Sequence, residues 1–529
     1  MNGLADRISA AWAILRLTLL VMMALLTLWL RVPQAAPAVD WPAKIEPILA
    51  DQVALAPNEK HEFILFLEEQ ADLSGAAGLK TQTEKGIYVY QRLSEVAERT
   101  QKPLLTALRT FGAEMRPFWV VNAIWARGDY RLIQRIAERS EVARLFANPS
   151  VRLDMPIEAG LSPWAITSAE AEGIEWNLLK VHADDLWSLG LLGQGVVVGG
   201  QDTGYDWEHP ALREKYRGWD GANADHNYNW HDAIHQDDAH TSLGNPCGFD
   251  SQQPCDDNGH GTHTMGIILG DDGAGNRIGV APGAQWIGCR NMEQGWGTPA
   301  SYIECYQWFV APTDSNHANP DPSKAPQVIN NSWGCLAEEG CTEPDILLAV
   351  VRNVHAAGIL TVHSAGNSGP ACETVAEPAA IYAESLTVGS TDTDDVIAPI
   401  SSRGPVTADG SGRLKPDVTA PGVNIRSSIP GDAYGGKSGT SMAAPHVSGL
   451  AALLISSWPE LAGQVDLLEE LITHSALPLT TLEPCGGTAG QVPNNVYGWG
   501  RIDAWAAYVH AQIVRSEHHA FFPVITKSK

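Results

Sequence analysis

The sequence predicts an α/β protein: a doubly wound parallel sheet in the longer C-terminal part, preceded by a small α+β domain with a ferredoxin-like fold. Two patterns support this prediction. In the C-terminal part, short continuous apolar runs alternate with helical stripes, which is typical of strands that helices cover on both faces. In the N-terminal part, the expected elements follow the order β-α-β-β-α-β. The 44% of apolar residues in this chain of 529 is enough for sizeable cores.

The small domain is expected over residues 59–155. Residues 63–67 predict a strand, and residues 88–111 predict a helix that Pro103 divides. A pair of strands, a helix capped by Asp129 and one more strand complete the unit. The three later strands are expected at residues 118–121, 123–126 and 142–146.

The doubly wound domain is expected over residues 174–512, followed by a tail at residues 513–529. A helical stripe at residues 346–354 ends before Gly358, a residue type that favours the position after a helix. Five apolar runs predict strands of the sheet: residues 196–198, 285–287, 328–329, 359–362 and 386–388.

The first 38 residues (1–38) have the pattern of a secretory signal peptide. Arg7 and Arg16 precede an apolar stretch at residues 17–30, and residues 36–38 offer a small-x-small cleavage site. These 14 residues are short for a membrane span of about 20. We therefore expect a secreted, extracellular protein, with an uncleaved anchor over residues 12–30 as the alternative. Residues 39–58, rich in Pro and Ala, are expected to form a linker.

Charge and cysteine content narrow the class of function. The chain has 35 Lys and Arg against 61 Asp and Glu, a net charge of −26, which argues against a nucleic-acid partner. None of the eight cysteines forms a C-x-x-C pair typical of zinc or redox sites. The close couples Cys247/Cys255 and Cys335/Cys341 predict disulfides in an oxidising compartment, with free buried thiols as the alternative. The full pairing cannot be deduced from the sequence.

Three segments carry candidate catalytic side chains, and the first two centre on Asp202 and His260. Asp202 follows an apolar strand, and functional groups collect at the carboxyl ends of strands in open α/β sheets. A dinucleotide-binding loop is the alternative, but no G-x-G-x-x-G leads from this strand into a helix. His260 opens an expected helix. Together with His263 it could bind a metal, but the glutamate base of zinc proteases is missing.

The third segment centres on Ser441, near the N-terminus of an expected helix. Unpaired N–H groups and the helix dipole favour negative charge at that position. Pro445 is expected in the opening turn, where it removes no intrahelical hydrogen bond. Ser441 alone also fits a plain capping role. A serine nucleophile, however, needs a base, and the base needs a carboxylate that fixes its tautomer, so the three segments together predict a catalytic triad.

The order Asp, His, Ser is that of the subtilases, and the sequence resembles this family in three signatures. The resemblance is strongest for bacillopeptidase F-like members. It implies a fold of the subtilisin type and a serine endopeptidase that acts on polypeptides through an acyl-enzyme, without a cofactor. A membrane-anchored processing protease with a narrow client and a non-catalytic subtilase-like binding protein are the alternatives. The signatures are Asp202-Thr203-Gly204, His260-Gly261-Thr262-His263 and Gly439-Thr440-Ser441-Met442-Ala443-Ala444-Pro445.

The same resemblance implies roles for further residues. Asn367 matches the oxyanion-hole residue of the family. Ala376 and Glu377 fall in the expected specificity pocket, where Ala376 narrows the pocket and Glu377 favours basic substrate residues. The edge segment expected to pair with the substrate backbone consists of Ser332, Trp333 and Gly334.

The resemblance also implies a maturation scheme. Residues 59–155 are similar to the family's propeptide, an intramolecular inhibitor and folding chaperone. Their charge complements the acidic remainder, since residues 91–144 hold ten Lys or Arg and six Asp or Glu. The connector at residues 156–173 is then expected to contain the maturation site. Many subtilases have a calcium-binding Asp where this chain has Ala211, so we expect no metal site, and we expect a monomer.

Overall fold

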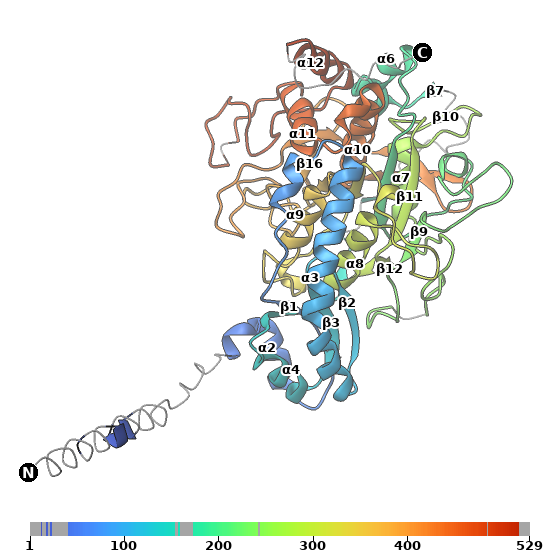
Figure 1. Ribbon diagram of the computed structural model, residues 1–529. Coiled ribbons are helices and arrows are strands. Elements are labelled where there is room, and N and C mark those ends of the chain that lie inside the picture. The colour runs from blue at the N-terminus through green and yellow to red at the C-terminus, as the bar shows by residue number, and fades with distance from the viewer. Residues whose placement is uncertain are drawn as a thin grey trace, which may run out of the picture.

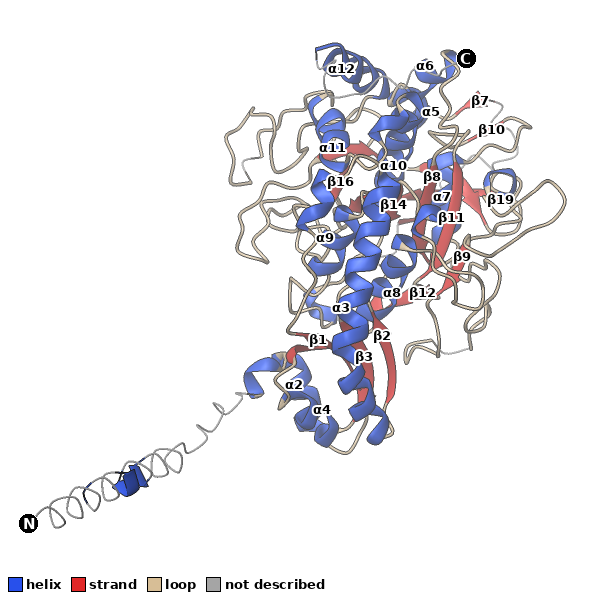
Figure 2. Cartoon of the chain, in the orientation of Figure 1, coloured by secondary structure: helices blue, strands red, loops and turns tan. Residues whose placement is uncertain are grey.

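A computed structural model describes residues 41–153, 157–158, 173–241, 244–483 and 485–517, together with six residues between positions 12 and 23. Almost all of the expected signal peptide and most of the expected connector lie outside the described residues. Figures 1 and 2 show a small domain beside a larger one, with one long helix running along both. Among the described residues, no helix has the length and apolar character needed to cross a membrane.

The small domain is a four-stranded antiparallel sheet with strand order β2-β3-β1-β4, packed against helices of the same domain. Along the chain its elements follow the β-α-β-β-α-β order that the sequence predicts. The strand expected at residues 118–121 lies earlier, because residues 119–122 form the turn of the β2–β3 hairpin. The elements are β1 (His61–Leu67), α3 (Gln82–Thr110), β2 (Glu114–Phe118), β3 (Ala123–Gly128), α4 (Tyr130–Ala137) and β4 (Val142–Ala147).

Helix α3 is continuous through Pro103, so the predicted division at this residue is wrong. A proline inside a helix costs about 3 kcal/mol. Leu104 and Leu108, just beyond it, are fully buried against the sheet, and burying each side chain contributes about 2 kcal/mol. A break at Pro103 would expose both leucines, so the continuous helix is the more stable arrangement.

The segment expected to be a linker, residues 39–58, is folded from Trp41 onward. It contains a short 3-10 helix η1 (Pro42–Lys44) and an α-helix α2 (Pro47–Leu55). Leu49 and Val53 of α2 are buried in the core of the small domain. The high Pro and Ala content predicts a linker, but Pro42 and Pro47 stand at the first positions of the two helices, where proline is tolerated, and Pro57 follows α2.

The larger domain is built on a seven-stranded parallel sheet with strand order β17-β16-β15-β14-β8-β11-β9. Five of these strands overlap the five apolar runs that predict them, although β8 and β15 each begin one residue later than predicted, and this confirms the expected α/β class. The other two, β9 and β17, were not predicted. The strands are β8 (Val197–Asp202), β9 (Trp230–Asp232), β11 (Gln285–Arg290), β14 (Val328–Asn331), β15 (Leu360–Ser364), β16 (Leu386–Thr391) and β17 (Val418–Pro421).

Helices cover both faces of this sheet. Neighbouring strand residues such as Val328 and Ile329 belong to different buried clusters, one on each face. The first cluster includes α7 (His260–Leu269), α10 (Thr440–Ser457), α11 (Val465–His474) and α12 (Ala504–Glu517). The second includes α8 (Pro299–Val310) and α9 (Leu348–Ala356), over which α3 of the small domain packs.

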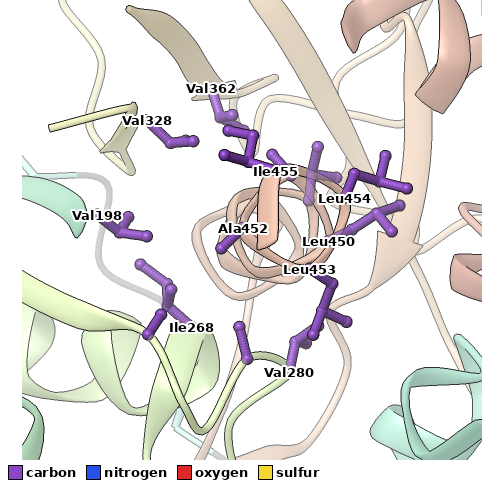
Figure 3. Packing of buried hydrophobic residues seen from close by; sticks show 14 of the residues in the cluster. Val198, Ile268, Val280, Val328, Val362, Leu450, Ala452, Leu453, Leu454 and Ile455 are labelled. Carbon is purple, nitrogen blue, oxygen red and sulfur yellow. The ribbon is translucent and has the colours of Figure 1, made fainter. Parts of the chain in front are cut away.

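Helix α10 runs through the centre of the first cluster. Figure 3 shows apolar side chains on all sides of this helix: Ala452 faces Val198 and Ile268, Leu453 faces Val280, and Leu450 and Leu454 point to the opposite side from Val198. A helix that is apolar on all sides must be buried on all sides. This packing fixes the position of the residues at its N-terminus.

The tail expected at residues 513–529 begins later than predicted, because α12 continues to Glu517. Val514 packs against the first cluster, and Arg515 forms an ion pair with Glu460 at 3.3 Å. These contacts keep the last turn of the helix on the domain. Residues 518–529 lie outside the described part of the chain.

All eight cysteines are paired in the structure. The two predicted couples, Cys247–Cys255 and Cys335–Cys341, close short loops. Two further pairs join more distant segments: Cys289–Cys305 links β11 to α8, and Cys372–Cys485 spans 113 residues.

Candidate active site

The candidate residues gather at the carboxyl edge of the parallel sheet. From β8 the chain continues to β11 on one side, and later to β14 on the other side, so the order of strands reverses at the β8–β14 pair. Ligands bind at such switch points in open α/β sheets. Asp202 is the last residue of β8, and Ser332 directly follows β14.

Asp202 and His260 form a buried pair. Asp202 ends β8, and His260 is the first residue of α7. The Nδ1 atom of His260 lies 2.7 Å from Oδ1 of Asp202, and both side chains are almost fully buried. Thr203 N–H donates to the same carboxylate at 2.8 Å, and the Thr264 hydroxyl donates at 3.3 Å. The carboxylate therefore orients the ring so that Nε2 is the nitrogen available for chemistry.

Asp256 joins the two signatures, a role that the sequence analysis missed. Its carboxylate accepts from the Thr203 hydroxyl at 2.9 Å and from the N–H groups of Gly259 and Thr262 at 2.7 and 3.0 Å. Gly259, the N-cap residue of α7, has no side chain to cap the helix. Asp256 supplies that cap from three residues upstream and ties the start of α7 to the loop after β8.

Ser441 is the second residue of α10 and forms two hydrogen bonds with Ser332. The Ser332 hydroxyl donates to the Ser441 carbonyl oxygen at 3.0 Å, and the Ser441 hydroxyl donates to the Ser332 carbonyl oxygen at 3.2 Å. The prediction that Pro445 removes no helical hydrogen bond is wrong. Because α10 begins at Thr440, Pro445 lies in its second turn and leaves the Ser441 carbonyl without an N–H donor. The Ser332 hydroxyl takes the place of that donor.

The His260 ring is positioned, but among the described residues no hydrogen bond joins it to Ser441. The Nε2 atom of His260 is buried and has no hydrogen-bond partner among the described residues. The Ser441 hydroxyl is bonded to Ser332 instead. Catalytic hydrogen bonds are often unmade in unliganded enzymes and form when the substrate binds.

His263 does not share a site with His260. Its Nε2–H group donates to the Gly435 carbonyl oxygen at 3.0 Å, on another segment. Burial, together with the charge of Lys437, lowers the pKa of His263 well below its usual value. His263 is therefore a neutral core histidine, and the two rings serve different partners.

Asn367 lies beside the N-terminus of α10. Its Oδ1 atom accepts from the Thr440 N–H at 2.9 Å and from the Thr440 hydroxyl at 3.0 Å. Because a backbone N–H must have an acceptor, these bonds fix which end of the amide is oxygen. The Nδ2 group is therefore left as a donor next to Ser441.

The expected substrate edge, Ser332 to Gly334, follows β14 without a partner strand among the described residues. The side chain of Trp333 is not part of a binding surface. It is buried and stacks on Tyr302 with 4.0 Å between ring centres. Only the backbone at this position is suited to contact a substrate.

Glu377 lies closer to the site than its sequence position suggests. It is 3% exposed, and Cβ atoms placed on Gly334 or Gly366 would overlap its carboxylate. Gly334 ends the expected substrate edge, and Gly366 directly precedes Asn367. Ala376, beside Glu377, is half-buried. The two glycines thus leave room for an acidic group between the edge segment and Asn367.

Comparisons with known proteins agree with this geometry. The sequence profile of the subtilase family matches residues 193–500. This chain belongs to the subtilase family. It is 36% identical to bacillopeptidase F of Bacillus subtilis (strain 168) over 447 residues, which are 81% of this chain and 29% of that protein.

Two more relatives of this subtilase come from the same Bacillus subtilis strain. Serine protease AprX is 32% identical over 59% of this chain and 66% of its own length. Subtilisin E is 29% identical over 78% of this chain and 91% of its own length. The chain thus spans less than a third of bacillopeptidase F but nearly all of subtilisin E.

The two carboxylates of the acidic turn at residues 270–276 are held by donors from nearby protein residues. Asp271 pairs with Arg277 at 3.0 Å, and Ala211 accepts from the N–H of Asp271. Asp272 accepts from Asn276 at 2.6 Å and from the Tyr434 hydroxyl at 3.0 Å. Protein donors therefore hold both carboxylates of this turn.

We expect the Asp256→Ala variant to lose turnover, because the loops that carry Asp202 and His260 lose their shared acceptor. The unfolding free energy should fall by about 1–2 kcal/mol, as for a lost N-cap. The turnover number should fall by about tenfold or more with little change in the Michaelis constant, since the change acts on the positions of the reacting groups. Steady-state kinetics and urea unfolding check both effects.

Asp220→Ala is the matched control for Asp256→Ala. Asp220 accepts from two backbone N–H groups in an exposed turn, at 2.6 and 2.8 Å, far from the expected catalytic residues in the sequence. Its variant should keep normal turnover. A loss of stability without loss of turnover in Asp256→Ala would reduce Asp256 to a plain structural cap.

Proposed function

We propose that this subtilase is a secreted serine endopeptidase that cleaves polypeptides through Asp202, His260 and Ser441. The observation that carries this proposal is the buried His260–Asp202 pair, with Nε2 of the ring left without a partner among the described residues at the edge where α10 begins. The expected secretion rests on the N-terminal sequence pattern and on the four disulfides.

In the first half of the reaction, Nε2 of His260 takes the hydroxyl proton of Ser441 while the serine oxygen attacks the scissile carbonyl carbon. Asp202 stabilises the resulting imidazolium. The carbonyl oxygen becomes an oxyanion, which accepts from Asn367 Nδ2–H and from the Ser441 N–H at the start of α10. The imidazolium then gives its proton to the amide nitrogen, the C–N bond breaks, and an acyl ester of Ser441 remains.

In the second half, a water molecule gives a proton to His260 as its oxygen attacks the acyl ester. The oxyanion forms again and accepts from the same two donors. Its collapse breaks the ester bond, and His260 returns the proton to the Ser441 oxygen. No cofactor takes part in these steps.

The Ser441→Ala variant should lower turnover by about a million-fold, the size of effect that removing the triad serine has in the related enzyme subtilisin. His260→Ala should lose nearly as much, and the double variant little more, since the two residues act as a unit. Casein hydrolysis and labelling by a fluorophosphonate probe measure the loss. Normal labelling of Ser441→Ala would show that another residue is the nucleophile, and a folded wild-type protein that is neither labelled nor active would favour the non-catalytic alternative.

Glu377 is proposed to select basic residues at the substrate position before the cut. Its carboxylate lies between Gly334 and Gly366, next to both the substrate edge and Asn367. A cationic side chain that reaches this carboxylate gains a charge-assisted hydrogen bond. The side-chain methyl group of Ala376 narrows the same pocket.

Glu377→Gln should lower kcat/KM for substrates with Arg or Lys at that position by about 10–100-fold, because a hydrogen bond to a charged group is worth about 1.5–3 kcal/mol. Substrates with Leu or Phe there should change little or improve. Digestion of a peptide library with mass-spectrometric readout gives both values. Glu373→Gln, an exposed acid in the same loop, is the control. An unchanged preference in Glu377→Gln would exclude this residue as the determinant.

The small domain is proposed to be the intramolecular inhibitor and chaperone of the peptidase domain. Its contacts join unlike charges: Arg116 pairs with Glu304 at 2.7 Å, and Arg144 pairs with Glu343 at 2.6 Å. Helix α3 also donates from Lys85 to the carbonyl of Gly463 at 2.6 Å.

Two short strands, one before and one after residues 154–156, pair with strands of the peptidase domain. Strand β5 (Val151–Arg152) pairs with β13 (Trp296–Gly297), and the Leu153 N–H donates to the Gly295 carbonyl at 2.7 Å. Strand β6 (Ile157–Glu158) pairs with β19 (Ala433–Ser438), which leads directly to Ser441. We therefore propose a scissile bond between residues 153 and 157, at the N-terminal boundary of the connector expected at residues 156–173 and before most of it.

This segment has no side chain that suits a basic-selective pocket, since residues 153–173 include no Lys or Arg. An intramolecular cut tolerates this mismatch, because tethering raises the effective concentration of the bond at the nucleophile. After the cut, the segment can still remain bound through the pairing of β5 with β13.

Wild-type protein should therefore start at residues 154–157, and Ser441→Ala should accumulate as an uncut precursor that starts near residue 39. N-terminal sequencing of both proteins tests this, in a host without extracellular proteases of its own. Fractionation of the same cultures separates protein in the medium from membrane-anchored protein. An identical N-terminus in both proteins would mean that another protease makes the cut.

A further inference from the structure

His355, Asp466 and Glu469 form a cluster of potential metal ligands outside the candidate active site. His355 lies in the last turn of α9, and Asp466 and Glu469 are three residues apart in α11, on one side of that helix. Each residue offers one ligand atom, and these atoms all lie within 4.8 Å of one another. The Nε2 atom of His355 is 3.0 Å from Oδ1 of Asp466.

The backbone holds the two helices together at this place. Gly358 follows α9 with a φ of 79°, and Gly463 precedes α11 with a φ of 85°. A Cβ on Gly358 would lie only 2.9 Å from the Cα of Gly463. The end of α9 is therefore packed directly against the start of α11, so the fold brings His355 next to Asp466 and Glu469.

Glu469 gives an independent reason to expect a cation. Its Oε1 atom is buried and accepts no hydrogen bond from the described residues. Its electrostatic neighbours are the carboxylates of Asp417, Asp466 and Glu384 and the ammonium group of Lys415. The basic group among these neighbours, Lys415, already donates to Asp417 and to a backbone carbonyl, both at 2.6 Å. A buried carboxylate without a donor is costly, and a bound cation removes that cost.

We propose that this cluster binds one divalent metal ion of the zinc class through His355 Nε2 and one carboxylate oxygen each from Asp466 and Glu469. Imidazole and carboxylate are ligands of Zn²⁺, and three protein ligands with a water complete its tetrahedral shell. Ca²⁺ fits less well, because it takes six to eight oxygen ligands. The Asp466 side chain is 90% exposed and is free to move inward as the ion binds.

Such an ion would cross-link α9, which covers one face of the parallel sheet, to α11, which packs on the other. His355 and Asp466 are about 110 residues apart in the sequence, which is why no local motif predicts the site. None of the proposed catalytic residues lies on α9 or α11, so the site is separate from the peptidase chemistry and its test does not require activity.

Isothermal titration with ZnCl₂ tests the proposal on the full chain carrying Ser441→Ala, after treatment with EDTA. We expect one equivalent of Zn²⁺ to bind, and saturating Zn²⁺ to raise the melting temperature by about 3 °C. Ca²⁺ at the same concentration should do neither. Co²⁺ in place of Zn²⁺ should give the visible absorption of a four-coordinate site.

Three variants localise the ion. Glu469→Gln and His355→Asn should each lower the affinity for Zn²⁺ by more than about tenfold, because each removes a ligand. Glu470→Gln, next in sequence and exposed, should bind like the parent protein. Binding is compared rather than stability, since Glu469→Gln also removes a buried carboxylate. The absence of Zn²⁺ binding, or unchanged affinity in both ligand variants, would overturn the proposal.

Discussion

The complete burial of α10 is the constraint on which the candidate active site depends. Sixteen of its residues, from Thr440 to Ile455, are buried, and they contact the central strands on one side and α7 on the other. Because the helix has no solvent-exposed face over this length, it cannot slide or rotate without breaking apolar contacts. Gly449 shows how close the packing is, since a Cβ there would lie 2.5 Å from the Cβ of Val280. Ser441 and its N–H group are therefore held at one place at the edge of the sheet.

Close packing around β8 explains the glycines near Asp202 that suggest a dinucleotide-binding loop as an alternative. Gly199 and Gly200 lie within β8, and side chains at these positions would overlap Phe309 and Tyr205. These glycines let α8 and the loop after β8 approach the strand, so they serve the core and not a phosphate. Asp202, two residues later, then leaves the strand directly beside the buried start of α7. Rigid elements on both sides, joined through Asp256, hold the His260–Asp202 pair.

Much of the fold follows from local sequence patterns. The features that the sequence does not predict depend on contacts between distant segments. The central strands are continuous apolar runs, so the sequence predicts them. Edge strand β9, Trp230–Asp232, contains a histidine and an aspartate that are buried only by tertiary contacts, and β17 is short and ends in Pro421. Asp256 caps α7 from three residues before the N-cap residue, which is a glycine. The usual capping pattern therefore does not reveal the role of Asp256. The His355 cluster depends on two helices, α9 and α11, that meet only in the folded chain.

Charge at the domain boundary determines how tightly the proposed inhibitor can hold. A cavity of about 840 Å³ lies between the two domains and is lined by Arg116, His231, His235 and Glu304. Burial alone would raise the pKa of Glu304, but hydrogen bonds from the two histidines and the charge of Arg116 hold it well below its usual value. Glu304 thus keeps its histidine partners whether or not Arg116 is present, so the peptidase domain does not need the small domain to stabilise this carboxylate. The Arg116–Glu304 pair is partly buried, with 25% and 10% of its side chains exposed, so desolvation offsets part of its Coulombic attraction. The contact favours correct docking while the chain is continuous, and it leaves release possible once the tether and its high effective concentration are lost.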